Sequence, residues 1–167
     1  IELTTDAEFD APIIDLRATA SMRDVINAHH YLPKTLPPKV LDWLDGAIGG
    51  GSISSATFRL SGPLKAFPYR NGEGEFLIKA DFRDARFRYA PDWPEVTNAS
   101  GQLVFSGPSL YTVQNSARVS GIDVRNVNAR IADLRDGIVE LEASANTDLP
   151  KVLNFLQNSP VRKFTGA

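Results

Sequence analysis

Few side chains in this sequence could do chemistry. The chain has 167 residues, no cysteine and only two histidines, the neighbours His29 and His30. The lack of cysteine excludes a disulfide scaffold, a thiolate metal site and a cysteine nucleophile. Neighbouring residues of a helix point about 100° apart, so the two histidines would share one metal ion poorly. We therefore expect no metal and no cofactor.

Paired aspartates are the other candidates for chemistry, since paired carboxylates serve acid–base and glycosidase catalysis. Three pairs have a spacing of three residues: Asp81/Asp84, Asp133/Asp136 and Asp42/Asp45. The first pair alternates with Arg83, Arg86 and Arg88, which is typical of a salt-bridged face turned to solvent. We expect that the protein is not an enzyme and has no catalytic residue.

Glycine clusters and charge exclude further classes of function. The runs Gly49-Gly50-Gly51 and Gly72-Glu73-Gly74 match no phosphate-binding motif, so we interpret them as turns. A net charge of −2 has the wrong sign for a nucleic-acid partner. No stretch approaches the roughly 20 apolar residues of a membrane span. Because the chain starts at Ile1 and not at methionine, we expect a piece of a longer protein.

Alternating apolar and polar residues dominate the elements that must carry these side chains. Such alternation predicts strands over 12–20, from about 52, over 75–90, 98–106, 110–120 and 137–146. In 75–90 the apolar residues fall on even positions up to Phe82 and on odd positions from Ala85. One extra residue inverts a strand, so we expect a bulge or a tight turn near Arg83 and Asp84. A similar flip separates Val124 from Val127.

Three short helices are predicted between the strands. Ser21 and Asp24 resemble a capping box ahead of a first helix, which should end before Pro33. A second begins at Pro37-Pro38 and ends at the glycine run. A third begins near Asp148 and ends before Pro160, with Val152, Leu153 and Leu156 buried, while Val139, Leu141, Ala143 and Ala145 form the buried face of the preceding strand.

The sequence also resembles itself, which points to repeated modules. Residues 35–44 align with 147–156, and the strand pattern Leu16-x-Ala18-x-Ala20 matches Leu141-x-Ala143-x-Ala145. We expect residues 1–33 to end a preceding module, 34–160 to form one module, and 161–167 to begin the next. The predicted fold is mainly β with three short helices, in a curled, twisted antiparallel sheet that forms an open apolar groove.

Several motifs, in order, resemble the YhdP branch of the AsmA-like proteins of Gram-negative bacteria. They are Tyr31-Leu32-Pro33, Pro38 to Ile48 with Trp43, Phe67-Pro68-Tyr69, Tyr89-x-Pro91-Asp92-Trp93-Pro94, Gly101-x-Leu103-x-Phe105 and Ile131-x-Asp133-Leu134. We interpret Tyr31, Pro33, Trp43, Pro68, Tyr89, Pro91, Trp93 and Pro94 as structural residues of the family. Trp93 should pack over the edge of the sheet, since two prolines fix the backbone around it.

The resemblance implies a long periplasmic protein, anchored in the inner membrane, that carries phospholipids to the outer membrane along an apolar β groove. The expected partners are phospholipid acyl chains, with membranes contacted through parts absent from this chain, which we expect to be monomeric. The side chains expected to line the groove are Phe76, Ile78, Phe82, Leu103, Phe105, Val139 and Leu141. The alternative is a structural module that assists outer-membrane assembly. A closed, filled sandwich would favour that alternative, and an open groove would favour the conduit.

Overall fold

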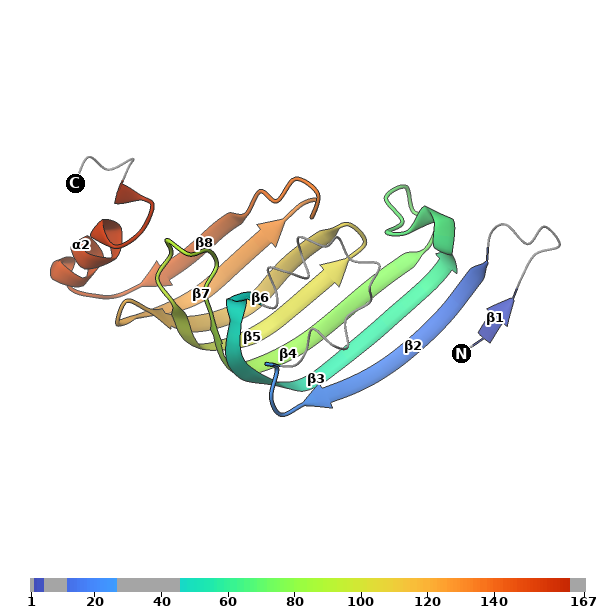
Figure 1. The fold of residues 1–167 in the computed structure, drawn as a ribbon, viewed down its shortest axis with the longest axis horizontal. Coiled ribbons are helices and arrows are strands. Elements are labelled where there is room, and N and C mark those ends of the chain that lie inside the picture. The colour runs from blue at the N-terminus through green and yellow to red at the C-terminus, as the bar shows by residue number, and fades with distance from the viewer. Residues whose placement is uncertain (1, 5–11, 27–45, 163–167) are drawn as a thin grey trace.

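The computed structural model describes residues 2–4, 12–26 and 46–162. Eight strands form one sheet in which every strand pairs antiparallel with its neighbours in sequence (Figure 1). The strands are β1 (Glu2–Thr4), β2 (Ile13–Met22), β3 (Ile48–Pro63), β4 (Glu75–Phe87), β5 (Val96–Ser106), β6 (Ser109–Val119), β7 (Ile122–Ile131) and β8 (Glu140–Ala145). A 3-10 turn, η2 (Leu64–Ala66), follows β3, and helix α2 (Leu149–Gln157) follows β8.

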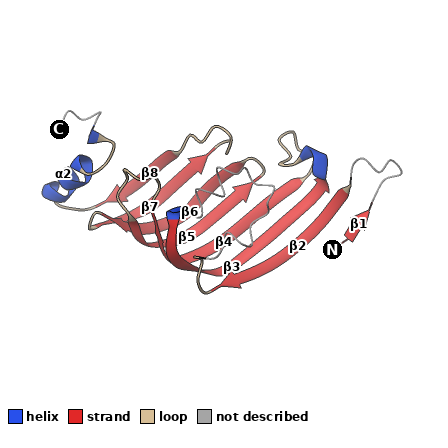
Figure 2. Ribbon diagram, viewed as in Figure 1, coloured by secondary structure: helices blue, strands red, loops and turns tan. Residues whose placement is uncertain are grey.

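The strands bend along their length, so the sheet is curled and open (Figure 1). The helical segments lie next to strand ends: Gly46 and Ala47 come just before β3, η2 follows β3, and α2 lies beyond β8 (Figure 2). No second sheet is present among the described residues. The prediction of a mainly β protein with a curled antiparallel sheet is therefore confirmed.

The predicted bulge near Arg83 and Asp84 is confirmed. The β4–β5 register shifts between Phe82 and Ala85, and Asp84 has a φ of 50°. Its backbone N–H has left the ladder and donates to Ser100 Oγ at 3.2 Å. The extra residue keeps Ala85 and Phe87 on the same face as Phe82, because it compensates for the change of phase in the sequence.

Similar bulges cross the neighbouring strands. Asn98, Gln114 and Asn126 have φ values of 50°, 53° and 51°, and each lies at a shift of register in β5, β6 or β7. The bulge at Asn126 confirms the second predicted flip. Bulges strengthen the local twist and bend a strand. A line of them across four adjacent strands therefore favours the curl of the sheet.

The first predicted helix is wrong at its start. Ser21 and Met22 are the last two residues of β2, and Asp24 caps a turn by accepting a hydrogen bond from the backbone N–H of Ile26 at 3.0 Å. The register continues into Met22, which lies opposite Ile53 of β3. Pairing with β3 thus outweighs the local capping signal. The remainder of this predicted helix lies outside the described residues.

The glycine run is not a turn but part of β3. Most of the second predicted helix lies outside the described residues, and only Gly46 and Ala47 are described as helical. Strand β3 begins at Ile48, and Gly51, at a φ of 125°, passes so close to β4 that a Cβ there would come within 2.7 Å of Ala85 Cα. Glycine is needed here for a close approach of two strands, a reason that the sequence does not reveal.

The third helix is confirmed as α2, but its predicted burial is wrong. None of its residues is buried, and Leu153 is 44% exposed. All six residues of β8 are likewise exposed, with Leu141 at 64%. The cause is topological: β8 is the last strand of the sheet, so its outer edge has no neighbour among the described residues.

Candidate functional site

One face of the sheet is apolar from β2 to β8. Residues directly opposite each other in an antiparallel pair point to the same side. The register carries one such row across the sheet through Ala18, Phe58, Ile78, Phe105, Leu110 and Ile131. A second row runs through Ala20, Ala56, Ala80, Leu103 and Thr112. We call this side the apolar face.

Six of the residues predicted to line a groove, namely those within strands, lie on this one face. Phe82 lies opposite Ile53 of β3, and Leu141 lies opposite Ala129, whose N–H donates to Thr112 Oγ1 at 2.9 Å. Val139 stands just before β8, two residues from Leu141. Phe76, opposite Leu60, is the most covered of them, at 5% exposed.

Phe76 is covered by an aromatic cluster that also contains Phe58, Phe67 and Tyr69. Its ring makes edge contacts with Phe67 at 5.0 Å and with Phe58 at 6.1 Å between centroids, and Phe67 in turn contacts Tyr69 at 6.1 Å. Residues 64–74 thus fold back over the apolar face at one end of β3 and β4. Edge-to-face ring pairs hold this cover in place.

The middle of the apolar face holds one buried polar side chain. Asn115, 6% exposed, accepts from the backbone N–H of Gln102 at 3.0 Å and donates to Val127 O at 3.1 Å. It replaces ladder hydrogen bonds that the bulges remove from β5, β6 and β7. Its amide occupies the space above Gly101, where any Cβ would overlap it. This explains why the strand has a glycine at this position.

Charged groups hold together the end of the sheet that carries residues 64–74. Asp133 accepts from Arg70 Nε and Nη2 at 3.2 and 3.0 Å, and from Arg135 Nη2 at 2.8 Å. These hydrogen bonds, from Arg135 first and then from Arg70, hold the pKa of Asp133 well below its usual range. We call Arg70, Asp133 and Arg135 the rim clamp, since it joins the segment after β3 to the β7–β8 connection.

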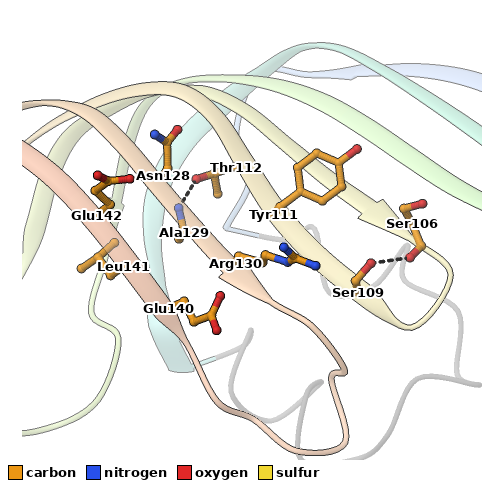
Figure 3. Close-up of a pocket in the computed structure, with 10 residues that line it drawn as sticks. All are labelled: Ser106, Ser109, Tyr111, Thr112, Asn128, Ala129, Arg130, Glu140, Leu141 and Glu142. Atoms are coloured by element: carbon orange, nitrogen blue, oxygen red, sulfur yellow. Dashed lines mark hydrogen bonds between the residues drawn. The ribbon is translucent and has the colours of Figure 1, made fainter.

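The opposite face of the sheet is mainly polar, although Leu77, Val104 and Val113 lie on it. A hollow of about 570 Å3 over β6–β8 is lined by residues of that face together with Thr112, Ala129 and Leu141 (Figure 3). Tyr111, Arg130 and Glu140 stand opposite one another on β6, β7 and β8. Glu140 and Glu142 alternate on one strand, so they are neighbours on the same wall and do not face each other. The hollow therefore lacks the opposed acids that a glycosidase needs.

The other aspartates and the histidines considered for catalysis or metal binding either make structural contacts or lie outside the described residues. Asp81 accepts from Gln102 Nε2 at 2.9 Å, and Arg86 lies 3.8 Å from Glu95, so the expected ion pairs between the arginines and Asp81 or Asp84 are not formed. In the described ranges no group of three metal-ligating side chains occurs, and no helix there is long and apolar enough to cross a membrane. His29, His30, Asp42 and Asp45 lie outside those ranges.

The structural motif residues fall at the ends of strands. Pro68 follows a cis peptide bond in the segment after η2. Tyr89 and Trp93 make an edge contact at 6.0 Å within the β4–β5 connection, which also holds Pro91 and Pro94. Tyr31, Pro33 and Trp43 lie outside the described residues.

The residues predicted to line a groove did not include several members of the apolar face. They are Ile14, Leu16, Phe58, Leu60, Leu110 and Ile131, and the alternation within each strand would have indicated them. Sequence reasoning also missed Tyr69, which is 5% exposed, although the Phe67-Pro68-Tyr69 motif was recognised. Nothing in the sequence separates this tyrosine from an exposed one.

This architecture, a one-layer curled sheet with one apolar and one polar face, defines a protein whose distinctive surface is apolar. The family model described as YhdP protein matches residues 1–167, so the chain belongs to the YhdP family. A relative from Escherichia coli (strain K12), named intermembrane phospholipid transporter YhdP, is 30% identical over 159 residues. The match covers 95% of this chain and 13% of that protein. No solved structure matches the chain.

Proposed function

We propose that this chain is a non-enzymatic segment of a periplasmic protein that carries phospholipids between the inner and outer membranes. The observation that carries the proposal is the register, which places continuous rows of mainly apolar side chains from β2–β8 on one face of an open sheet. Acyl chains lie on that face because their burial there releases water from both surfaces. Headgroups remain at the charged ends of the strands. The relative's name, as a phospholipid transporter, supports the same cargo.

The apolar face continues from one module to the next in this proposal. The boundary placed between residues 33 and 34 separates β2 from β3, yet the two strands pair from Ile13 opposite Pro63 to Met22 opposite Ile53. The sheet therefore does not stop at the module boundary. Such continuity suits a conduit, in which lipid must pass between modules. The parent protein is anchored in the inner membrane through parts outside this chain.

The alternative, a module that assists outer-membrane assembly, rests on an expected closed and filled sandwich. The described strands form a single layer, and among them only Val104 is less than 2% exposed. No observation on the described residues therefore favours this alternative over the conduit.

Site-specific photocrosslinking of neighbouring residues in one strand tests the proposed function. A photoreactive phenylalanine analogue at Leu103 or Phe105 lies on the apolar face, and the same analogue at Gln102 lies on the polar face. We expect phospholipid adducts from the first two positions and not from the third when the protein is expressed in Gram-negative cells. Equal labelling at all three positions, or none at any, would contradict the proposal.

A further inference from the structure

The turn between η2 and β4 contains the pair Asn71-Gly72, which has no part in the proposed function. Both residues are exposed, and Gly72 has a φ of 80° with no atom within 4 Å of the place where a Cβ would stand. An asparagine that precedes glycine reacts readily with its own backbone, because glycine has no side chain to hinder the approach of its nitrogen. Water reaches this pair, and no neighbouring atom obstructs the reaction.

The reaction in question is deamidation. The backbone nitrogen of Gly72 gives its proton to hydroxide and attacks Cγ of Asn71, so a new N–C bond closes a succinimide ring. The side-chain nitrogen of Asn71 leaves as ammonia with a proton from water, which regenerates the hydroxide. Water then opens the ring at one of its two carbonyl carbons. The product is aspartate or isoaspartate, and in isoaspartate the backbone runs through the former side-chain carbonyl carbon.

One neighbouring side chain restrains the reacting groups. The carboxylate of Glu73 accepts from the Asn71 backbone N–H at 3.0 Å and from Asn71 Nδ2 at 2.9 Å. The second of these hydrogen bonds is lost when Nδ2 leaves as ammonia, so it stabilises the unreacted amide. The attacking nitrogen is engaged as well, since Gly72 N–H donates to Tyr69 O at 3.3 Å.

The charge of Glu73 acts in the same direction. Hydrogen bonds lower the pKa of this carboxyl, first from its own backbone N–H and then from Asn71, so the group is ionised at neutral pH. A carboxylate beside Gly72 disfavours the anionic nitrogen that must form before attack. Glu73 therefore slows a reaction that the exposed turn otherwise permits.

We propose that Asn71 is a site of spontaneous deamidation and that the Glu73 carboxylate sets the rate of this reaction in the folded protein. The inference is independent of the proposed function, since it requires only an exposed turn and water. Asn128 shows the contrast. It is also exposed, but the next residue is Ala129, whose N–H is held in the sheet by Thr112 Oγ1 at 2.9 Å.

The modification would alter the segment that covers one end of the apolar face. Arg70 is fixed by Asp133, and Gly74 lies so close to Tyr69 that a Cβ would come within 2.7 Å of Cε1. The backbone between Arg70 and Gly74 thus has a set length, which isoaspartate increases by one carbon atom. Aspartate at this position instead places a second carboxylate beside Glu73. Either product should loosen the cover formed by residues 64–74.

Peptide mapping of the aged protein tests the site. Trypsin releases residues 71–79, in which Asn71 is the only amide side chain, and residues 126–130, in which no asparagine precedes glycine. The full chain is kept folded in mildly alkaline buffer and then digested. We expect mass spectrometry to show the exchange of NH2 for OH in residues 71–79 and not in residues 126–130.

Glu73→Ala tests the control of the rate. The variant removes the charge and both hydrogen bonds, so deamidation of the folded chain should become about three- to tenfold faster, as for the loss of one hydrogen bond. In urea, where neither chain is folded, the two rates should converge. Glu75→Ala is the matched control, because that carboxylate lies 2.9 Å from Arg59 and makes no contact with Asn71, and its rate should equal that of the wild type.

Three results would overturn parts of the proposal. An unchanged peptide 71–79, under conditions that convert the free peptide of the same sequence, would exclude the site. Equal rates in folded wild type and Glu73→Ala would remove Glu73 from the account. Asn71→Asp reproduces one product and should lower the melting temperature by roughly 2–4 °C, as for one hydrogen bond in a chain of this size. An unchanged melting temperature would show that the modification does not loosen the cover.

Discussion

Asp133 receives hydrogen bonds from Arg135, two residues away, and from Arg70, which is distant in sequence. Arg70 lies in the β3–β4 connection and Arg135 in the β7–β8 connection, so the carboxylate ties together two connections whose strands do not pair with each other. Its side chain is 17% exposed, less than that of either arginine. The rim clamp therefore restrains the covering segment 64–74 relative to the rest of the sheet.

Asp133→Asn should destabilise the protein at neutral pH and lose that effect in acid. The pKa of Asp133 is lowered in the folded state, so its contribution is complete above the unfolded value of about 4 and is lost as the pH falls through the lower folded value. Thermal unfolding of both proteins from neutral pH to below pH ~4 should show the difference between them narrowing. Asp136→Asn, which leaves the clamp intact, is the control. A constant difference at every pH would contradict the argument.

Strand β4 depends on a single residue to keep its two faces distinct. Phe82 and Phe87 are an odd number of residues apart, yet both belong to the apolar face because Asp84 forms a bulge between them. Bulges at corresponding places in β5, β6 and β7 have the same effect, so the apolar face continues past the bend in each strand.

Deletion of Asp84 should therefore be far more harmful than its replacement. Without the bulge, Ala85 and Phe87 move to the polar face and Arg86 moves to the apolar face. We expect a loss of at least about 2 kcal/mol in urea unfolding, the cost of exposing one aromatic side chain. Asp84→Gly keeps the bulge and suits the φ of 50°, so its stability should stay within about 1 kcal/mol of the wild type. Equal stability of the two variants would show that the bulge does not set the faces.

The described part of the chain forms a single layer of sheet, which leaves many of its apolar side chains only partly covered. Among the residues that the structure describes, the buried apolar ones are Val25, Ala47, Tyr69, Phe76, Ala80, Ala99, Val104 and Ile122. Ile138, Leu141 and Leu149 are 70%, 64% and 69% exposed, near the outer edge of β8. A ligand that covers the apolar face would supply contacts that a second layer gives to an ordinary β sandwich.

Short-chain phosphatidylcholine should therefore raise the melting temperature in proportion to the logarithm of its concentration, once binding saturates. Because the contact is apolar, the shift should persist when salt rises from about 0.1 M to about 1 M. Glycerophosphocholine, the headgroup without chains, should have no effect. Leu141→Asp should fold normally, since the residue is 64% exposed, and should reduce the shift, whereas Glu142→Gln on the polar face should not. A shift that glycerophosphocholine reproduces would contradict binding through the chains.

The alternation of residues determined the strands, the apolar face and the bulges at Asp84 and Asn126, because each depends on which side of its own strand a residue points to. Short motifs such as Phe67-Pro68-Tyr69 also indicated the family. Each of these properties depends on residues that are close together in the chain, so a single sequence contains the information. The six predicted lining residues that lie within strands share a face for the same reason.

Tertiary structure alone decided which segments pair and which side chains are covered by others. The glycine run at 49–51 belongs to β3 because β4 passes within contact of Gly51, and Ser21 extends β2 because β3 lies beside it. The exposure of Leu141 and Leu153 follows from the position of β8 at the end of the sheet, and the burial of Tyr69 follows from Gly62 and Gly74. Each of these depends on a neighbour in space, and neighbours in space are what the order of residues by itself does not contain.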